Sequence, residues 1–337
     1  ELCKPLNSSS VDLECSFNSV SVPCNKALRP GTLVQAQCKH SYNLLSLSDG
    51  FDVTRCLANG ELETPLFHCT PECGIVNHDS ARPLINDGEV AKVGEYPWHV
   101  GIYRSGKNDQ ICGGTLLSPH IVLTAAHCVY SESKHKVLDP SNFLVAVGKY
   151  KRALDPPEPF QQVEQAREVI LELGYRGSRT GYEQDIAIID VKKHFILSNM
   201  VLPVCLDGGS LRAIPVGTKG TVVGWGKTEK KVSSEVLLVT HLPLIDYQTC
   251  NRDLPDNFIR FITSDKFCAG YINGTGVQEG DSGGGLTFQE FNKHYIHGVV
   301  SLKPKEVEKS YALFTNVTIH KSWILKTIRA LKPHHPN

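Results

Sequence analysis

The sequence predicts an all-β protein in two parts, a small disulfide-rich module followed by a larger domain of many short strands. The length of 337 residues is too great for one comfortable core and suits a small module plus a barrel-sized domain. Seven of the twelve cysteines precede residue 74, which places the boundary near Cys73. From residue 85 onward, short β-rich runs recur between Gly, Pro and Asp residues, as expected for many short strands.

Composition excludes several classes of partner. The formal net charge is +0, so no global field attracts nucleic acid or an anionic membrane. No run of eighteen apolar residues exists, and residues 1–10 lack the basic and apolar regions of a signal peptide, so we expect a trimmed chain with no membrane partner. The even cysteine count, without a CxxC pair, favours disulfides over zinc and hence a secreted, extracellular protein. Sequons at Asn7, Asn273 and Asn316 agree with secretion.

Residues 1–72 form the expected module. Its cysteines lie among turn residues in an order that resembles a complement-control (sushi) module: Cys3, Gly31, Cys38, Tyr42, Cys56, Gly60, Pro65 and Cys69. Six cysteines allow fifteen pairings, and the resemblance implies Cys3 with Cys56, Cys38 with Cys69, and the remaining Cys15 with Cys24. Leu62 replaces the tryptophan usual in these modules. Because so small a module buries little core, we expect disulfides to supply its stability.

Residues 85–337 form the expected larger domain. Its candidate strands are residues 99–103, 121–123, 143–147, 186–191, 221–223 and 295–300. Many short strands separated by turns indicate a sandwich or barrel. Near the end, Ile319, Trp323, Ile324 and Ile328 fall at helical spacing, which predicts a final helix laid against the barrel.

Three segments carry candidate chemistry, namely Thr124-Ala-Ala-His127-Cys128, Asp185-Ile-Ala-Ile188 and Gly280-Asp281-Ser282-Gly283-Gly284. Alone, each has an ordinary reading as a surface histidine, a strand edge or a glycine-rich turn. In the order His127, Asp185 and Ser282, they resemble the chymotrypsin family of serine proteases. The resemblance covers residues 85–337 and includes Pro97-Trp98, Cys112-Gly-Gly, Gly224-Trp225-Gly226 and Cys268-Ala-Gly. It implies a chymotrypsin-like double six-stranded β-barrel with a C-terminal helix.

The resemblance assigns a role to each of these residues. Ser282 would be the nucleophile, His127 the general base and then acid, and Asp185 the group that fixes the imidazole tautomer. The backbone N–H groups of Gly280 and Ser282 would form the oxyanion hole. Ser301 would donate a hydrogen bond to Asp185. No cofactor and no metal are expected, since Lys149 replaces the first calcium ligand of the family.

Disulfides and activation follow from the same resemblance. Two family bridges match Cys112 with Cys128 and Cys250 with Cys268, and Cys73 with Cys205 matches the bridge that ties a light chain to the catalytic domain. Residues 73–84 would be the linker and activation segment. Cleavage after Leu84 would free Ile85, whose ammonium would pair with Asp281. Gln110 stands where many zymogens of the family hold that aspartate with a histidine.

The specificity pocket is expected at Gly276, Val277, Ser301 and Ala312. Gly276 lies six residues before the nucleophile, where an aspartate makes a trypsin. The sequence therefore predicts a pocket without a fixed charge that accepts an apolar residue such as leucine.

Two departures concern the cleft around this pocket. Gln278 replaces a cysteine of the family bridge beside it. The usual Ser-Trp-Gly reads Ser301-Leu302-Lys303, so a lysine would crowd or charge the groove.

The whole architecture resembles the modular serine proteases of insects, and complement proteases and horseshoe-crab clotting factors share it. This implies a zymogen that activates itself after Leu84 and cleaves a downstream protease zymogen in Toll signalling or melanisation. Expected partners are an upstream pattern-recognition protein and a serpin inhibitor, in haemolymph if the source is an insect. The alternatives are an inactive binding pseudoprotease of the haptoglobin type, which requires a broken triad, an adhesive disulfide-rich protein, and a digestive chymotrypsin- or elastase-like protease.

Overall fold

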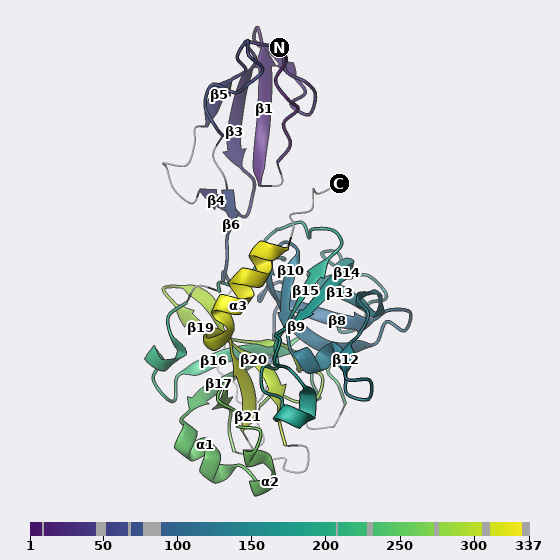
Figure 1. Ribbon diagram of the computed structural model, residues 1–337, viewed down its shortest axis with the longest axis vertical. Coiled ribbons are helices and arrows are strands. Elements are labelled where there is room, and N and C mark those ends of the chain that lie inside the picture. The colour runs from purple at the N-terminus through teal and green to yellow at the C-terminus, as the bar shows by residue number, and fades with distance from the viewer. Residues whose placement is uncertain are drawn as a thin grey trace. The chain divides into compact units, whose positions relative to one another are not determined.

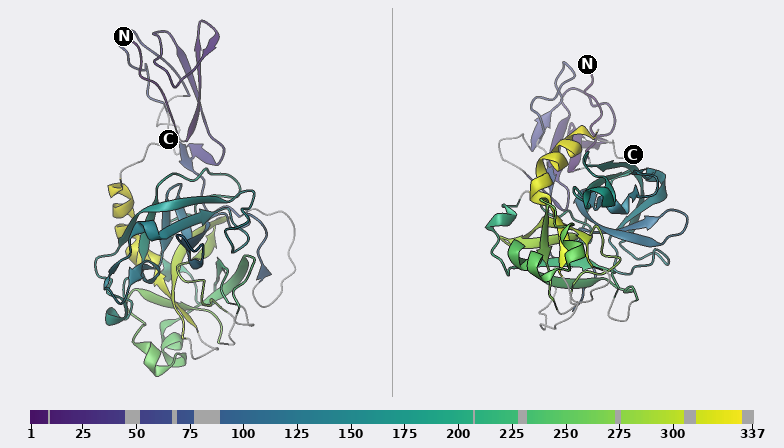
Figure 2. Two further views of the ribbon diagram at one scale, coloured as in Figure 1. Left: turned by 90° about the vertical axis from the view of Figure 1, so that its right-hand side faces the viewer. Right: turned by 60° about the horizontal axis from the view of Figure 1, so that its bottom comes forward.

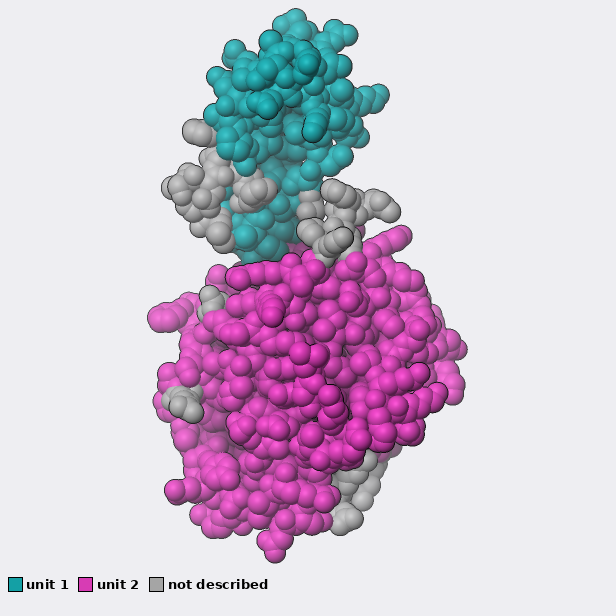
Figure 3. Space-filling view, viewed as in Figure 1, with its two compact units in different colours: residues 1–72, 336 teal, residues 73–335, 337 magenta. Residues whose placement is uncertain are grey.

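The computed structural model describes residues 1–8, 10–44, 52–66, 69–76, 89–206, 208–227, 232–272, 276–304 and 311–331. The chain divides into two compact units, Glu1–Glu72 and the part from Cys73 onward, which Figure 3 shows in teal and magenta. Leu84, Ile85 and Asn273 lie outside the described residues.

An antiparallel sheet of the order β2-β1-β3-β5 and a ribbon of β4 with β6 build the first unit. Its strands are β1 (Val11–Phe17), β2 (Val20–Val22), β3 (Leu33–Cys38), β4 (Tyr42–Leu44), β5 (Val53–Arg55) and β6 (Cys69–Pro71). In β3 alternate side chains, Val34 and Ala36, are buried, which is the pattern of a strand with one covered face.

Disulfides form much of the core of this unit. They join Cys3 with Cys56, Cys15 with Cys24, and Cys38 with Cys69. Cys3, Cys15 and Cys56 pack with Leu28 and Val34, and the partly buried Leu62 lies against this cluster. The sulfur atoms thus fill space that aliphatic side chains would fill in a larger domain.

The first barrel of the second unit is closed and has the strand order β10-β15-β14-β13-β8-β9 (Figure 1). Its strands are β8 (His99–Arg104), β9 (Gln110–Ser118), β10 (Ile121–Thr124), β13 (Phe143–Val147), β14 (Gln162–Leu171) and β15 (Ala187–Val191). A short ribbon of β11 (Tyr130–Ser131) and β12 (Lys136–Val137) follows β10. Ile102, Leu123, Val145 and Ile188 are fully buried and form part of the core.

A second barrel follows along the chain, with the order β16-β19-β20-β21-β18-β17 closed by pairing of β16 with β17. Its strands are β16 (Lys219–Gly224), β17 (Leu238–Ile245), β18 (Lys266–Ala269), β19 (Gly285–Glu290), β20 (Lys293–Leu302) and β21 (Ala312–Asn316), and β7 (Glu89–Val90) pairs with β17 at the edge. In Figure 2 the first barrel is blue to teal and the second runs from green to yellow. The predicted double six-stranded barrel is confirmed.

Helices are few in the described part of the chain. They are α1 (Tyr247–Asp253), α2 (Asp256–Ile259), α3 (Val317–Ala330) and the 3-10 turns η1 (Ala126–Cys128), η2 (Pro140–Asn142), η3 (Gly177–Thr180) and η4 (Leu211–Ala213). Asn316 caps α3 by accepting the Thr318 N–H at 3.0 Å. Of the helices in the described ranges, none has the length and apolar character that a membrane span requires.

The predicted C-terminal helix is confirmed as α3, but its buried face differs from the predicted one. Val317, His320 and Ile324 are buried, whereas Ile319 is 55% exposed. His320 can lie at the centre of the buried face because two carboxylates form hydrogen bonds with its ring nitrogens there. The His320 ring bonds Glu172 on one side and Asp265 at 3.1 Å on the other.

Candidate active site

Strand pairing in the first barrel brings His127 and Asp185 together. β10 and β15 are antiparallel neighbours in which Thr124 lies opposite Ala187. The residues just after β10 therefore lie beside those just before β15. His127 falls in η1, and the disulfide from Cys128 to Cys112 in β9 ties this turn to the barrel.

Asp185 is fully buried, and both of its carboxylate oxygens accept hydrogen bonds. Its Oδ2 lies 2.8 Å from His127 Nδ1, and its Oδ1 accepts the His127 backbone N–H at 2.8 Å. Ser301 in β20 donates its hydroxyl to the same carboxylate at 2.6 Å, and the Thr315 hydroxyl donates to the Asp185 carbonyl at 2.9 Å. Donors from both barrels thus hold the carboxylate in one orientation toward the imidazole.

Burial and pairing act in opposite directions on the two groups. Burial by itself lowers the pKa of His127, but the charge and hydrogen bond of Asp185 outweigh it and raise the pKa above 6.5. Burial by itself raises the pKa of Asp185, but His127, Lys266 and Ser301 together hold it below its ordinary value. Asp185 is therefore the anion of the pair at neutral pH, and it stabilises a positive charge on the ring.

Ser282 lies in the loop before β19, and backbone bonds place it against the first barrel. Its carbonyl accepts the Gly113 N–H at 2.8 Å, and the Gly283 N–H bonds Val300 at 2.9 Å. Gly283 has φ +80°, and a Cβ there would lie 2.2 Å from Thr124 Oγ1, so only glycine fits. Within the described ranges no hydrogen bond joins the Ser282 hydroxyl to His127, and such bonds typically tighten only when substrate binds.

Gln110 holds the oxyanion loop from the first barrel. Its Nε2 donates to the Gly280 carbonyl at 3.0 Å. The sequence marks this position only as lacking the family's histidine. Because an amide does not titrate, this contact is independent of pH.

Asp281 is partly buried and is held by backbone N–H groups. It accepts from Gly226 at 2.7 Å and from Gln278 at 2.9 Å, and no described cation is within ion-pair distance. The approach is so close that a Cβ on Gly226 would lie 2.1 Å from its Oδ2. Burial raises the pKa of Asp281 to about 6, although the two N–H bonds and the charge of Lys303 oppose the rise.

This raised pKa predicts a pH-dependent stability of the uncut chain. The Asp281 carboxyl has a pKa near 4 in the unfolded chain and about 6 in the folded chain, so it is neutral in both states below pH 4. The free-energy cost of burying an ionised carboxylate is therefore absent below pH 4. The cost grows from pH 4 to 6 and reaches about 3 kcal/mol above pH 6. The free energies of unfolding of Ser282→Ala and of the double variant Ser282→Ala with Asp281→Asn are measured by urea titration. Between pH 4 and 7, Ser282→Ala should lose about 3 kcal/mol of stability relative to the double variant. An unchanged difference would contradict the burial of an ionised Asp281.

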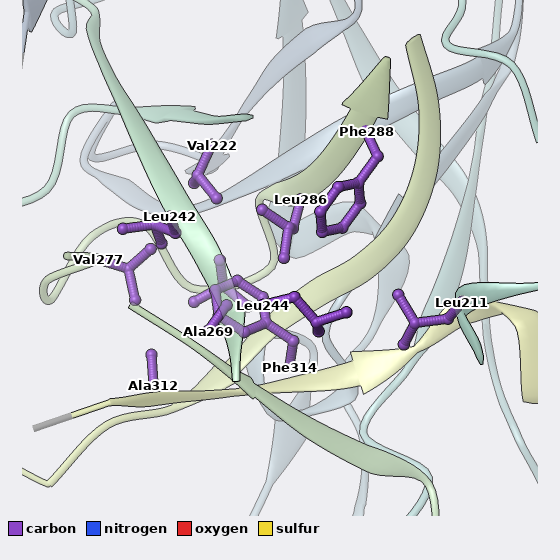
Figure 4. Close-up of a cluster of buried hydrophobic side chains, with 11 residues drawn as sticks. Leu211, Val222, Leu242, Leu244, Ala269, Val277, Leu286, Phe288, Ala312 and Phe314 are labelled. Atoms are coloured by element: carbon purple, nitrogen blue, oxygen red, sulfur yellow. The ribbon is translucent and has the colours of Figure 1, made fainter. Parts of the chain in front are cut away.

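The expected specificity residues belong to the second barrel and to the loop before β19. Val277 and Ala312 are 2% and 3% exposed and belong to the buried cluster of the second barrel that Figure 4 shows. The sequence predicts pocket walls without a fixed charge and a lysine, Lys303, that crowds or charges the groove, and the structure places this ammonium beside Gly276. Lys303 Nζ lies 3.8 Å from the position that a Cβ on Gly276 would take. The Lys303 side chain can take this direction because Gly276 has no side chain and leaves space for the ammonium.

The residues of the expected calcium loop do not fit a calcium ion. The Lys149 ammonium lies 2.9 Å from Glu158 Oε2 and also bonds the side-chain oxygen of Gln161. An internal cation thus already neutralises this carboxylate. Cys112, His127 and Cys128 lie close enough to share a metal, but the two cysteines are joined in a disulfide.

The remaining expected sites are placed as follows. Disulfides join Cys73 with Cys205, Cys112 with Cys128, and Cys250 with Cys268. Asn7 is exposed and Asn316 is partly buried at the helix cap. Thr315 and Lys266 also act on Asp185 but could not be found from the sequence, since neither belongs to a local motif of the catalytic residues.

Two six-stranded barrels with His127 and Asp185 on one and Ser282 on the other define a serine protease of the chymotrypsin class. The chain belongs to the trypsin family, whose model, described as Trypsin, matches residues 85–324.

Relatives of the chain include a clotting factor, a modular serine protease and a complement subcomponent. It is 33% identical to Clotting factor C of Tachypleus tridentatus, over 89% of this chain and 30% of that protein. It is 29% identical to Modular serine protease of Drosophila melanogaster, over 93% of this chain and 51% of that protein. It is 30% identical to Complement C1s-1 subcomponent of Mus musculus, over 89% of this chain and 44% of that protein. The chain thus spans from about a third to a half of the length of these relatives, and it is a serine protease of their modular type.

Proposed function

We propose that this chain is a secreted serine endopeptidase, made as a zymogen, that cleaves another protease zymogen in an innate-immune cascade. One observation carries the enzymatic part, namely the buried Asp185 with His127 Nδ1 at 2.8 Å and Ser301 at 2.6 Å. An inactive binding protein has no need to keep these donors aligned on a buried carboxylate.

In the proposed reaction, His127 removes the proton of Ser282 as the hydroxyl attacks the scissile carbonyl. The Asp185 carboxylate stabilises the imidazolium that forms and keeps Nε2 free to act as the base. Backbone N–H groups of Gly280 and Ser282 bind the oxyanion, where losing one donor typically costs about 3 kcal/mol. His127 then returns the proton to the leaving amine.

Activation is proposed to occur by cleavage after Leu84. The ammonium of Ile85 would then pair with Asp281, which accepts only backbone N–H groups among the described residues and has a raised pKa. Such a pair would remove the cost of the buried carboxylate and order the oxyanion loop. Because Cys73 is joined to Cys205, the two fragments would stay linked.

Self-activation is tested at Leu84. Leu84→Arg should suppress self-processing, because an arginine would meet no counter-ion in the pocket, and it should make the chain cleavable by trypsin. Ser282→Ala alone should stay uncut, and active wild type added in trans should cut it. Cut protein should run as one band without reductant and as two fragments with it.

Two results would overturn self-activation. One is normal maturation of the isolated Ser282→Ala chain, and the other is cleavage of arginine substrates in preference to leucine substrates by the wild type. Either result would require a separate upstream protease.

The cascade role is supported by the relatives, whose names include a clotting factor, a complement subcomponent and a modular serine protease. We propose a downstream zymogen as the substrate, a pattern-recognition protein as the upstream partner and a serpin as the inhibitor, with Toll signalling or melanisation as the output. Residues 1–72 would be a sushi-like recognition module and residues 73–84 the activation segment. Disulfides and the exposed sequon at Asn7 support an extracellular location. Incubating the activated enzyme with candidate zymogens and sequencing the new N-termini tests the substrate.

A further inference from the structure

Lys303 places its ammonium beside Gly276, the residue expected at the base of the specificity pocket. The residue follows directly after β20, and its Nζ is buried without any hydrogen-bond acceptor in the described part of the chain. The atom lies 3.8 Å from the Cβ position of Gly276, the residue at the base of the pocket. A lysine that only covered the surface would keep its ammonium in water.

The surroundings offer this ammonium little compensation. Val277, which follows Gly276 in the chain, and Ala312 at the start of β21 are apolar and buried. Asp281 acts on it electrostatically, but that carboxylate takes its hydrogen bonds from the N–H groups of Gly226 and Gln278. Burial lowers the pKa of Lys303, and the charge of Asp281 opposes this. A buried ammonium without a bonded partner is energetically costly, so an added carboxylate would bind favourably.

Activation would make this imbalance larger. In the proposed active form the Ile85 ammonium neutralises Asp281, the carboxylate that acts on Lys303 among the described residues. A side chain that enters the pocket then meets an unpaired cation. An anionic side chain would pair with it, a neutral side chain would leave it unpaired, and a cationic side chain would be repelled.

We propose that Lys303 is a specificity-determining residue that makes the pocket select for a carboxylate. The enzyme therefore favours Asp or Glu at P1, which is the residue before the scissile bond, and rejects Arg and Lys there. This inference rests on the proposed protease function. Leucine enters only by leaving the ammonium unpaired or displacing it, so cleavage after Leu84 is slow. Slow self-cleavage suits a zymogen that cuts itself only when it is concentrated.

The test compares substrates that differ only in charge at P1. Cut wild-type protein, with active sites counted by a fluorophosphonate, is assayed on peptides identical except for Glu, Gln, Leu or Arg at P1. We expect kcat/KM for Glu to exceed that for the isosteric Gln about tenfold or more, and Arg to be the poorest substrate. Lys303→Met, which keeps the length and removes the charge, should reduce the Glu to Gln ratio to about one and increase cleavage after Leu. Lys303→Arg should keep the preference for Glu.

Lys293→Met is the matched control, because this lysine is exposed at the other end of the same strand. It should leave all four rates unchanged. If Lys303 merely supported Asp281, Lys303→Met would lower all rates together and leave the Glu to Gln ratio unchanged. Equal cleavage after Glu and Gln by the wild type, or a ratio that survives Lys303→Met, would overturn the inference.

Failure of the proposed function gives a different result. In that case the fluorophosphonate would not label Ser282 and no peptide would be cleaved. The charge preference would then be measured by fluorescence anisotropy with labelled, C-terminally amidated peptides that end in Glu or Gln. Tighter binding of the Glu peptide that is lost in Lys303→Met supports the inference, and equal binding overturns it.

Discussion

Replacement of Ser282 by alanine is expected to lower kcat about 10⁶-fold, because the attacking oxygen is lost and the imidazole has no proton to accept. The residual rate would come from substrate binding and the oxyanion hole alone. Steady-state hydrolysis of a peptide ester by the cut protein measures the loss. Folding should be retained, since the loop position depends on backbone bonds of Ser282 and Gly283 and not on the hydroxyl.

A serine-directed phosphonate provides the control for this experiment. It should label the cut wild type at Ser282, leave Ser282→Ala unlabelled and label the uncut chain poorly, because only the cut form is proposed to complete its oxyanion hole. Equal labelling of cut and uncut chains would remove the zymogen proposal while leaving the catalytic one intact.

Asp185→Asn should lower kcat about 10⁴-fold at neutral pH, because the amide no longer stabilises the imidazolium or enforces the correct tautomer. The substitution should also move the pH profile. Activity requires neutral His127, so wild-type activity falls as the pH drops through the His127 pKa, which Asp185 raises above 6.5. Without that charge the pKa of His127 falls, and the acidic limb should shift to lower pH. Rates measured from pH 5 to 9 test both effects.

Asp246→Asn is a suitable control for loss of one carboxylate. Asp246 caps α1 by accepting the Thr249 N–H at 2.9 Å, and asparagine is an equally good cap. Its kcat and pH profile should match those of the wild type. A wild-type profile without an acidic limb, or an unshifted limb in Asp185→Asn, would contradict the assignment of His127 as the base.

The class of fold and the catalytic residues were predictable from the sequence. Strand-length β-rich runs indicated a sandwich or barrel and a helical repeat indicated the last helix, while the order of His127, Asp185 and Ser282 assigned the catalytic residues through its resemblance to the chymotrypsin family. These features are local, since the spacing of apolar residues decides the type of element and a short glycine-rich segment decides where a nucleophile can be exposed. The uneven division of the cysteines likewise predicted a boundary near Cys73.

Tertiary packing, by contrast, sets the direction of individual side chains. It turned Ile319 toward solvent and His320 inward, because Glu172 and Asp265 meet the imidazole there. It placed Gln110 on the Gly280 carbonyl and Lys303 beside Gly276, across separations of 170 and 27 residues. No local pattern encodes such contacts, because the direction of a side chain depends on the space and the partners that distant segments leave around it. The catalytic residues and a lysine near the groove could therefore be predicted from motifs, whereas the position of the Lys303 ammonium beside Gly276 depended on packing.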